Sequence, residues 1–66
     1  MKNNIKVERV IKGLTQEELA NKVSVSRQTI NAMEGNKYVP STVLAMKIAR
    51  VFNKKVEDIF SLEKAD

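Results

Sequence analysis

Three side chains that can hydrogen-bond to the edges of nucleic-acid bases lie close together near the middle of the chain. Arg27 and Gln28 take the first two positions of a predicted helix, and Asn31 follows about one turn later on the same side. Arginine can form paired hydrogen bonds to guanine, and glutamine can form them to adenine. In the alternative interpretation Arg27 contacts only phosphate, while Gln28 and Asn31 are solvated polar surface. The three residues are therefore candidates for reading bases.

Two short predicted helices must position these side chains, and both carry clear start signals. Thr15, with Glu18 three residues later, is typical of a reciprocal capping box, and Ser26 is a second N-cap. Apolar pairs flank both caps and can form hydrophobic staples: Leu14 with Leu19, and Val25 with Ile30. The turn between the helices covers about residues 23–25, which is the spacing of a helix-turn-helix. The second helix of such a pair can enter the DNA major groove.

The whole chain is predicted to form one all-α domain, residues 1–66, with five helices. They are expected at about residues 5–12, 14–23, 26–34, 42–52 and 56–60. Gly13, Gly35 and Asn53 are the expected stops after the first, third and fourth helices. Asn3 or Asn4 is the expected cap of the first.

Apolar spacing predicts which faces are buried. In the first helix the spacing predicts that most of one face is buried, a face formed by Ile5, Val7, Val10 and Ile11. In the fourth helix the stripe consists of Val43 or Leu44, then Ile48, Ala49 and Phe52. Residues 61–64 fit either a short C-terminal strand or a frayed tail, and residues 1–3 do not favour a strand.

The composition argues against several classes of protein. With 66 residues and neither cysteine nor histidine, the chain lacks thiolate ligands, disulfides and the commonest general base. No catalytic site, metal site, cofactor or small-molecule ligand is therefore expected. No apolar run reaches the roughly 20 residues of a membrane span, and no secretory signal is present, so a cytoplasmic protein is expected.

The charge pattern favours an anionic partner on one side of the molecule. Residues 1–12 carry +3 and residues 36–55 carry +5, whereas residues 56–66 carry −3. Basic charge thus flanks the central helices, and acidic charge collects at the C-terminal end. The pattern suggests that one end faces phosphate, although an ordinary solvated surface would also account for it.

The segment GLTQEELANKVSVSRQTINAMEGNKYVPS resembles the Xre/Cro-type helix-turn-helix regulators of phages and bacteria. The resemblance runs from Ile5 to Phe60. It rests also on Arg9, four residues before Gly13, and on the closing VEDIF. The length resembles the small, stand-alone cytolysin-regulator type. The resemblance implies a five-helix, lambda-repressor-like domain that forms a homodimer and binds double-stranded DNA.

The resemblance also implies roles for individual residues. The base-reading residues would be Arg27, Gln28 and Asn31. The phosphate-binding residues would be Gln16, Thr29, Asn36, Lys37 and Tyr38. A partly buried ion pair would join Arg9 to Glu34. Core packing would account for one or two of the apolar residues Ile59, Phe60 and Leu62, whereas a dimer interface would account for all three.

This chain departs from the family pattern in two places. Ser24 stands where the family usually has glycine, and a left-handed conformation there would cost on the order of 1 kcal/mol. Lys55 replaces the usual serine or threonine cap of the last helix, so that helix is expected to need the dimer for support.

The function expected from the sequence is a transcriptional regulator, a repressor that binds a pseudo-palindromic operator as a homodimer. One alternative is an antitoxin-like DNA-binding module that masks a partner protein, with the acidic C-terminus serving that partner. Another is a helical interaction module with no DNA role, which would lack a steep salt dependence.

Overall fold

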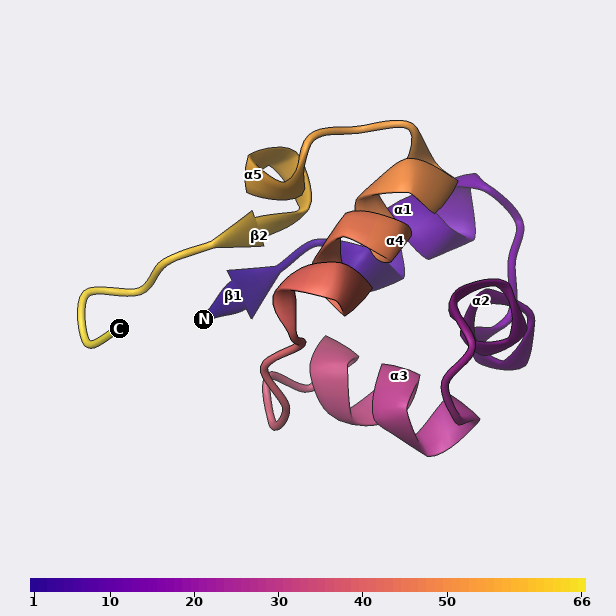
Figure 1. Cartoon of the computed structure of the whole chain (residues 1–66), viewed down its shortest axis with the longest axis horizontal. Coiled ribbons are helices and arrows are strands. Elements are labelled where there is room, and N and C mark those ends of the chain that lie inside the picture. Colours follow the sequence, from indigo (N-terminus) through magenta and orange to yellow (C-terminus); the bar gives the residue numbers. More distant parts are fainter.

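The computed structural model describes all 66 residues and contains five helices and one two-stranded sheet (Figure 1). The elements are β1 (Lys2–Asn3), α1 (Ile5–Ile11), α2 (Gln16–Val23), α3 (Arg27–Glu34), α4 (Thr42–Phe52), α5 (Val56–Ile59) and β2 (Phe60–Ser61). The prediction of five helices is confirmed. No helix has the length and apolar character needed to cross a membrane.

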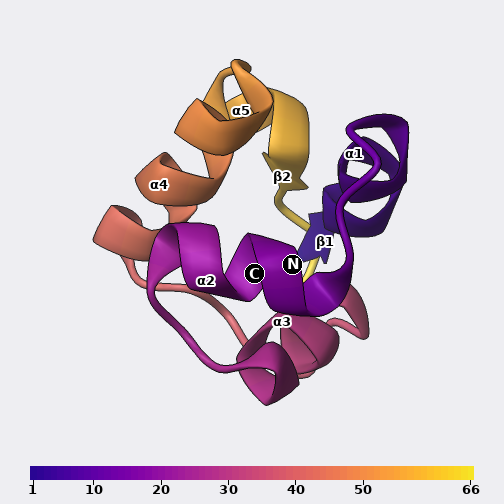
Figure 2. The ribbon, with the colours of Figure 1, turned by 90° about the vertical axis from the view of Figure 1, so that its right-hand side faces the viewer.

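The core lies between α4 and the other helices (Figures 1 and 2). Its most buried large side chains come from every helix: Ile5, Leu19, Val23, Ile30, Met33, Ile48 and Ile59. Burying one such side chain contributes about 1.5–3 kcal/mol. Leu14 and Val25, the outer members of the two predicted staples, pack partly buried against this core.

The predicted helix starts at Thr15, Ser26 and Ser41 are confirmed. The Thr15 hydroxyl accepts a hydrogen bond from the Glu18 N–H at 3.0 Å, and the Glu18 carboxylate accepts from the Thr15 N–H at 2.8 Å. The Ser26 and Ser41 hydroxyls cap α3 and α4 by accepting from the Thr29 and Leu44 N–H groups, each at 3.2 Å. These contacts satisfy backbone donors that a helix cannot pair within itself.

Helix α3 ends before Gly35, as predicted. That glycine has φ −86°, and the left-handed residue after α3 is Asn36, with φ 60°. The Asn36 N–H bonds to the Met33 carbonyl at 3.0 Å and the Lys37 N–H to the Ala32 carbonyl at 2.8 Å. This pair of bonds is a Schellman motif, in which the left-handed residue follows the C-cap Gly35.

The buried face predicted for α1 is wrong. Ile5 is fully buried, but Val7, Val10 and Ile11 are 57–70 % exposed. Glu8 faces inward instead, and its carboxylate lies 3.2 Å from the Lys54 Nζ. An inward charge can replace apolar packing here because a distant residue pairs with it. In α4 the sequence left either Val43 or Leu44 as the first buried residue. The structure shows that Leu44 is buried, whereas Val43 is 63 % exposed.

The sheet corrects the expectation for residues 1–3. Strand β1 pairs antiparallel with β2, with Lys2 opposite Ser61 and Asn3 opposite Phe60. The backbone N–H of Asn4 continues the contact by donating to the Ile59 carbonyl at 2.8 Å. Beyond β2, residues 62–66 extend away from the body (Figure 1), and Met1 forms ion pairs with this tail through Glu63 and Asp66.

Helix α5 has no side-chain cap on Lys55, as predicted from the lysine. A long hydrogen bond of 3.4 Å from the Lys55 N–H to the Asp58 carboxylate partly replaces it. Ile59 is 1 % exposed and anchors α5 in the core of its own chain. The expectation that this helix needs a second subunit for support stays a prediction.

Candidate nucleic-acid interface

Helix α3 lies at the edge of the molecule, with one long side free of other elements in both ribbon views (Figures 1 and 2). Its inner side carries Ile30 and Met33, which are fully buried. Arg27, Gln28 and Asn31 are exposed, and no hydrogen bond or ion pair within the chain engages their side chains. The structure thus places the three candidate base-reading residues together on one helix, free to bind an external partner.

Helix α2 packs against the buried side of α3, and the turn between them depends on Ser24. This residue has φ 62° and ψ 43°, a left-handed conformation, which the sequence had left open. The conformation costs an L-residue about 1–2 kcal/mol. The Val25 N–H donates to the Ala20 carbonyl at 3.0 Å and closes the end of α2. The crossing of the two helices is therefore kept despite the missing glycine.

Arg9 and Glu34, for which an ion pair was predicted, are joined by two hydrogen bonds. Arg9 Nε lies 2.7 Å from Glu34 Oε2, and Nη2 lies 3.2 Å from Oε1. The remaining guanidinium nitrogen, Nη1, donates to the Leu14 carbonyl at 2.9 Å. The two side chains are only 13 % and 6 % exposed. This cluster ties α1 and the start of the α2 segment to the end of α3.

Gln16, a candidate phosphate ligand, belongs to the same cluster. Its Nε2 donates to Glu34 Oε1 at 3.1 Å, which sequence reasoning missed because the two residues lie on different helices. A primary amide carries two N–H bonds, so one remains for another acceptor. Gln16 is also the first residue of α2, where free backbone N–H groups attract anions.

Thr29 and Asn36, two further candidate phosphate ligands, are partly engaged within the chain. The Thr29 and Ser26 hydroxyls share a hydrogen bond of 2.9 Å at the start of α3. Asn36 Oδ1 accepts from Asn3 Nδ2 at 3.0 Å, which leaves the Asn36 amide free to donate. Lys37 and Tyr38 follow directly and are exposed, with Tyr38 at 46 %. The loop therefore offers three successive donors beyond α3.

The residues expected at the dimer interface do not share one surface. Ile59 and Phe60 lie in the core at 1 % and 7 % exposure, whereas Leu62 on the tail is 80 % exposed. The first two are buried because α5 and β2 fold onto α4 and β1 of the same chain. Core packing therefore accounts for Ile59 and Phe60, Leu62 is the accessible member of the set, and the dimer interface stays a prediction.

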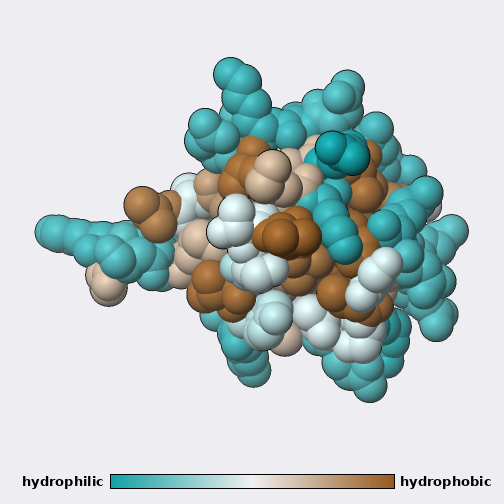
Figure 3. Space-filling model, viewed as in Figure 1, coloured by the Kyte–Doolittle hydropathy of each residue, from teal (hydrophilic) through white to brown (hydrophobic).

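An open groove between α4 and α5 is a more accessible apolar surface. Val43, Met46 and Val56 line it, together with the basic residues Lys47, Arg50, Lys54 and Lys55. Apolar side chains gather near the start of α4 on the face seen in Figure 3, and the projecting tail is mostly hydrophilic. No group of three or more acidic, histidine or cysteine side chains is placed to hold a metal.

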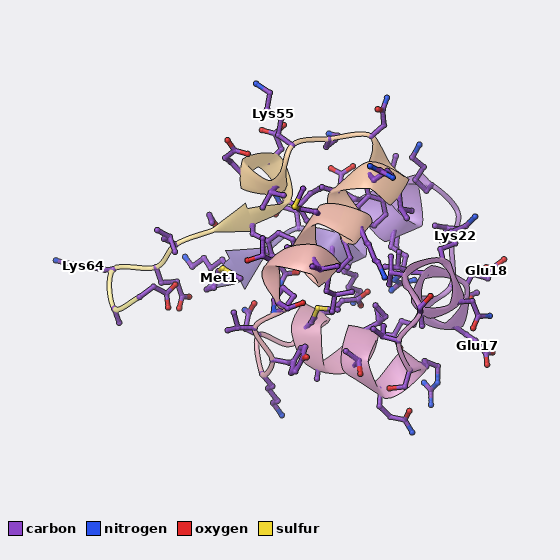
Figure 4. The ribbon with its side chains drawn as sticks, viewed as in Figure 1. Met1, Glu17, Glu18, Lys22, Lys55 and Lys64 are labelled. Atoms are coloured by element: carbon purple, nitrogen blue, oxygen red, sulfur yellow. The ribbon has the colours of Figure 1, made fainter.

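Three charged groups have displaced pKa values. The Thr15 backbone N–H and hydroxyl lower the pKa of Glu18 in the capping box. Hydrogen bonds to Asp66 and Glu63 raise the pKa of the Met1 ammonium, and the Glu63 N–H together with that ammonium lowers the pKa of Asp66. Figure 4 shows Glu18 on α2 and Met1 beside β1, so neither group belongs to α3. None of these shifts involves a candidate base-reading residue.

Comparison with known proteins shows the family to which this architecture belongs. The family model described as helix-turn-helix matches residues 5–59. An uncharacterized HTH-type transcriptional regulator of Methanocaldococcus jannaschii is 57 % identical over 63 residues, which cover 96 % of each chain. Another, from Archaeoglobus fulgidus, is 52 % identical over 66 residues, covering 100 % of this chain and 93 % of the relative. A third, from Bacillus subtilis, is 48 % identical over 64 residues, covering 97 % of both.

Proposed function

Because this chain belongs to the helix-turn-helix family and is a DNA-binding transcriptional regulator, we propose that it represses transcription by binding a pseudo-palindromic operator as a homodimer. The observation that carries the proposal is the free, polar side of α3. Arg27, Gln28 and Asn31 are exposed there and lack partners within the chain. In a helix-turn-helix the residues near the start of the second helix contact base edges. Gln28 would read adenine and Arg27 guanine, with Asn31 beside them.

Phosphate contacts would flank this reading helix on both sides. Gln16 would contribute its remaining amide N–H and the N-terminus of α2. The Asn36 amide, Lys37 and Tyr38 would follow the backbone beyond the end of α3. Thr29 would have a rim contact at most, because its hydroxyl is shared with Ser26. These contacts set orientation and most of the salt dependence, whereas α3 sets the sequence preference.

The groove between α4 and α5 supports a second copy of the chain as the dimer partner. Val43 and Met46 are 63 % and 59 % exposed in this groove, beside four basic side chains. The same chain carries acidic residues on the adjoining α5: Glu57 and Asp58. A two-fold axis places the same patch on both subunits, so basic and acidic residues of this region can pair across it. The exposed Leu62 adds an apolar contact from the tail.

Repression would follow from occlusion of the polymerase at the operator. The antitoxin-like alternative relied on the acidic C-terminus for a partner protein. Two of those acidic residues, Glu63 and Asp66, form ion pairs with Met1 in the structure, which favours the operator-binding proposal.

Selection of bound sequences from random DNA tests this proposal. The expected result is one enriched motif with two related half-sites about 34 Å apart, or one turn of DNA. Enrichment of a single half-site would contradict the homodimer. Recovery of no motif at low salt would contradict the base-reading role of α3.

A further inference from the structure

The side chain of Asn3, in β1, contacts two helices and the loop after α3. Its Oδ1 accepts a hydrogen bond from the Ile5 N–H at 3.1 Å, at the start of α1. Its Nδ2 donates to the Met33 carbonyl at 2.7 Å, in the last turn of α3, and to Asn36 Oδ1 at 3.0 Å. One amide thus uses its acceptor on α1 and its donors on the end of α3.

Asn36 sets the direction of the loop that follows α3. Its φ of 60° is a left-handed conformation that costs most residues about 1–2 kcal/mol. Its own N–H bonds to the Met33 carbonyl, the same group that accepts from Asn3. Asn3 therefore supports Asn36 through both its side chain and its backbone partner.

The other side of Asn3 is fixed by the sheet. Asn3 pairs with Phe60, which is 7 % exposed, and the adjacent Asn4 N–H donates to the Ile59 carbonyl at 2.8 Å. In Figures 1 and 2, β1 lies between β2 and α3. A continuous set of contacts therefore runs from Phe60 in β2, through Asn3, to Asn36, which begins the loop that carries Lys37 and Tyr38.

We propose that Asn3 is a positioning residue for DNA binding. It holds residues 36–38 so that their donors lie along the phosphate backbone, and it makes that loop depend on the pairing of β1 with β2. The inference rests on the proposed function, because the phosphate contacts of this loop are part of it. Without Asn3 the loop has to become ordered on binding, which costs side-chain and loop entropy.

The test uses Asn3→Asp, with Asn4→Asp as its matched control. Asn3→Asp keeps the size and the acceptor for Ile5, but it removes both donors and places a charged oxygen against the Met33 carbonyl. Asn4→Asp adds the same charge one residue away, at a side chain bonded only to the Asp58 carbonyl at 3.3 Å. In the free protein, the NMR amide signals of Lys37 and Tyr38 should shift and show faster local motion in Asn3→Asp alone.

DNA binding by the same variants gives the second measurement, from 50 to 300 mM salt. Loss of one phosphate contact should reduce the slope of log K against log salt by about 0.9, which is about fivefold in affinity near 0.15 M. Relative affinity for single-base variants of the site should stay unchanged. Unchanged loop signals, or an unchanged slope, in a folded Asn3→Asp overturns the proposal.

A second variant keeps the test decisive if Asn3→Asp does not fold. Asn36→Gly allows the left-handed conformation but removes the Oδ1 acceptor for Asn3. It should loosen the same loop and reduce the same slope, and a folded Asn36→Gly with wild-type loop signals also overturns the proposal. Failure of the wild-type protein to bind DNA would refute the proposed function. The NMR measurement would still decide whether Asn3 holds the loop.

Discussion

Removal of Arg9 should unfold this domain rather than only weaken DNA binding. Arg9→Ala deletes both hydrogen bonds to Glu34 and the bond to the Leu14 carbonyl. The Glu34 carboxylate, whose side chain is 6 % exposed, would keep only the neutral Gln16 amide as a partner. A buried charge that loses its partner typically costs 3–5 kcal/mol, so about that loss is expected here.

That loss is large compared with the total stability of a chain this small. At about 0.05–0.15 kcal/mol per residue, a domain of this size has roughly 3–10 kcal/mol in all. Each kcal/mol corresponds to about 4–8 °C in the melting temperature of a domain of 60–100 residues. The variant should therefore melt at least about 12 °C below wild type, or be unfolded at 25 °C.

Circular dichroism melts and urea titrations measure this directly. Lys6→Ala is the matched control, because Lys6 is an exposed residue of the same helix with no ion pair, and it should change stability by less than about 0.5 kcal/mol. Arg9→Lys keeps the charge but loses the paired hydrogen bonds, so its melting temperature should lie between those of Lys6→Ala and Arg9→Ala. A wild-type melting temperature for Arg9→Ala, combined with lost DNA affinity, would refute the structural role of this ion pair.

Three further predictions follow from the caps and the tail. Ser24→Gly should raise stability by about 1 kcal/mol, since it removes left-handed strain, and an unchanged or lower melting temperature would contradict this. The pKa of Glu18 is lowered in the fold, so its stabilisation is present above its unfolded pKa and is lost as pH falls through the folded value. The melting temperature of wild type should therefore fall toward that of Glu18→Gln below about pH 4. A constant difference between the two melting temperatures at all pH values would contradict the capping role of the carboxylate. Leu62→Asp should weaken the homodimer without changing the monomer fold, and sedimentation should show more monomer; an unchanged dimer fraction would exclude Leu62 from the interface.

The sequence predicted the helix-turn-helix well because its signals are local. Thr15, Ser26 and Ser41 form the expected caps, since a cap depends on residues within a few positions. The candidate base-reading residues follow from the same periodicity, because the buried Ile30 leaves the opposite side of α3 exposed.

The errors arise where distant residues decide burial. The inward Glu8 is paired with Lys54, so the apolar side chains of α1 were wrongly assigned to the core. Strand β1 depends on Asn3, whose side chain bonds to Met33 thirty residues away. Periodicity and strand propensity carry no information about such contacts. The burial of Phe60 likewise depends on how α5 returns the chain to β1.

The central claim is that α3 reads bases while the loop after it contacts phosphate. It is tested most directly by titrating wild type, Gln28→Ala and Lys37→Ala against the selected operator and its single-base variants at several salt concentrations. Gln28→Ala should lose about 1–3 kcal/mol of binding free energy for the operator, and its sequence preference should relax at one base pair per half-site. Lys37→Ala should weaken all sequences alike and reduce the salt slope by about 1. Equal losses on every sequence for Gln28→Ala, with an unchanged salt slope for Lys37→Ala, would contradict this division of roles.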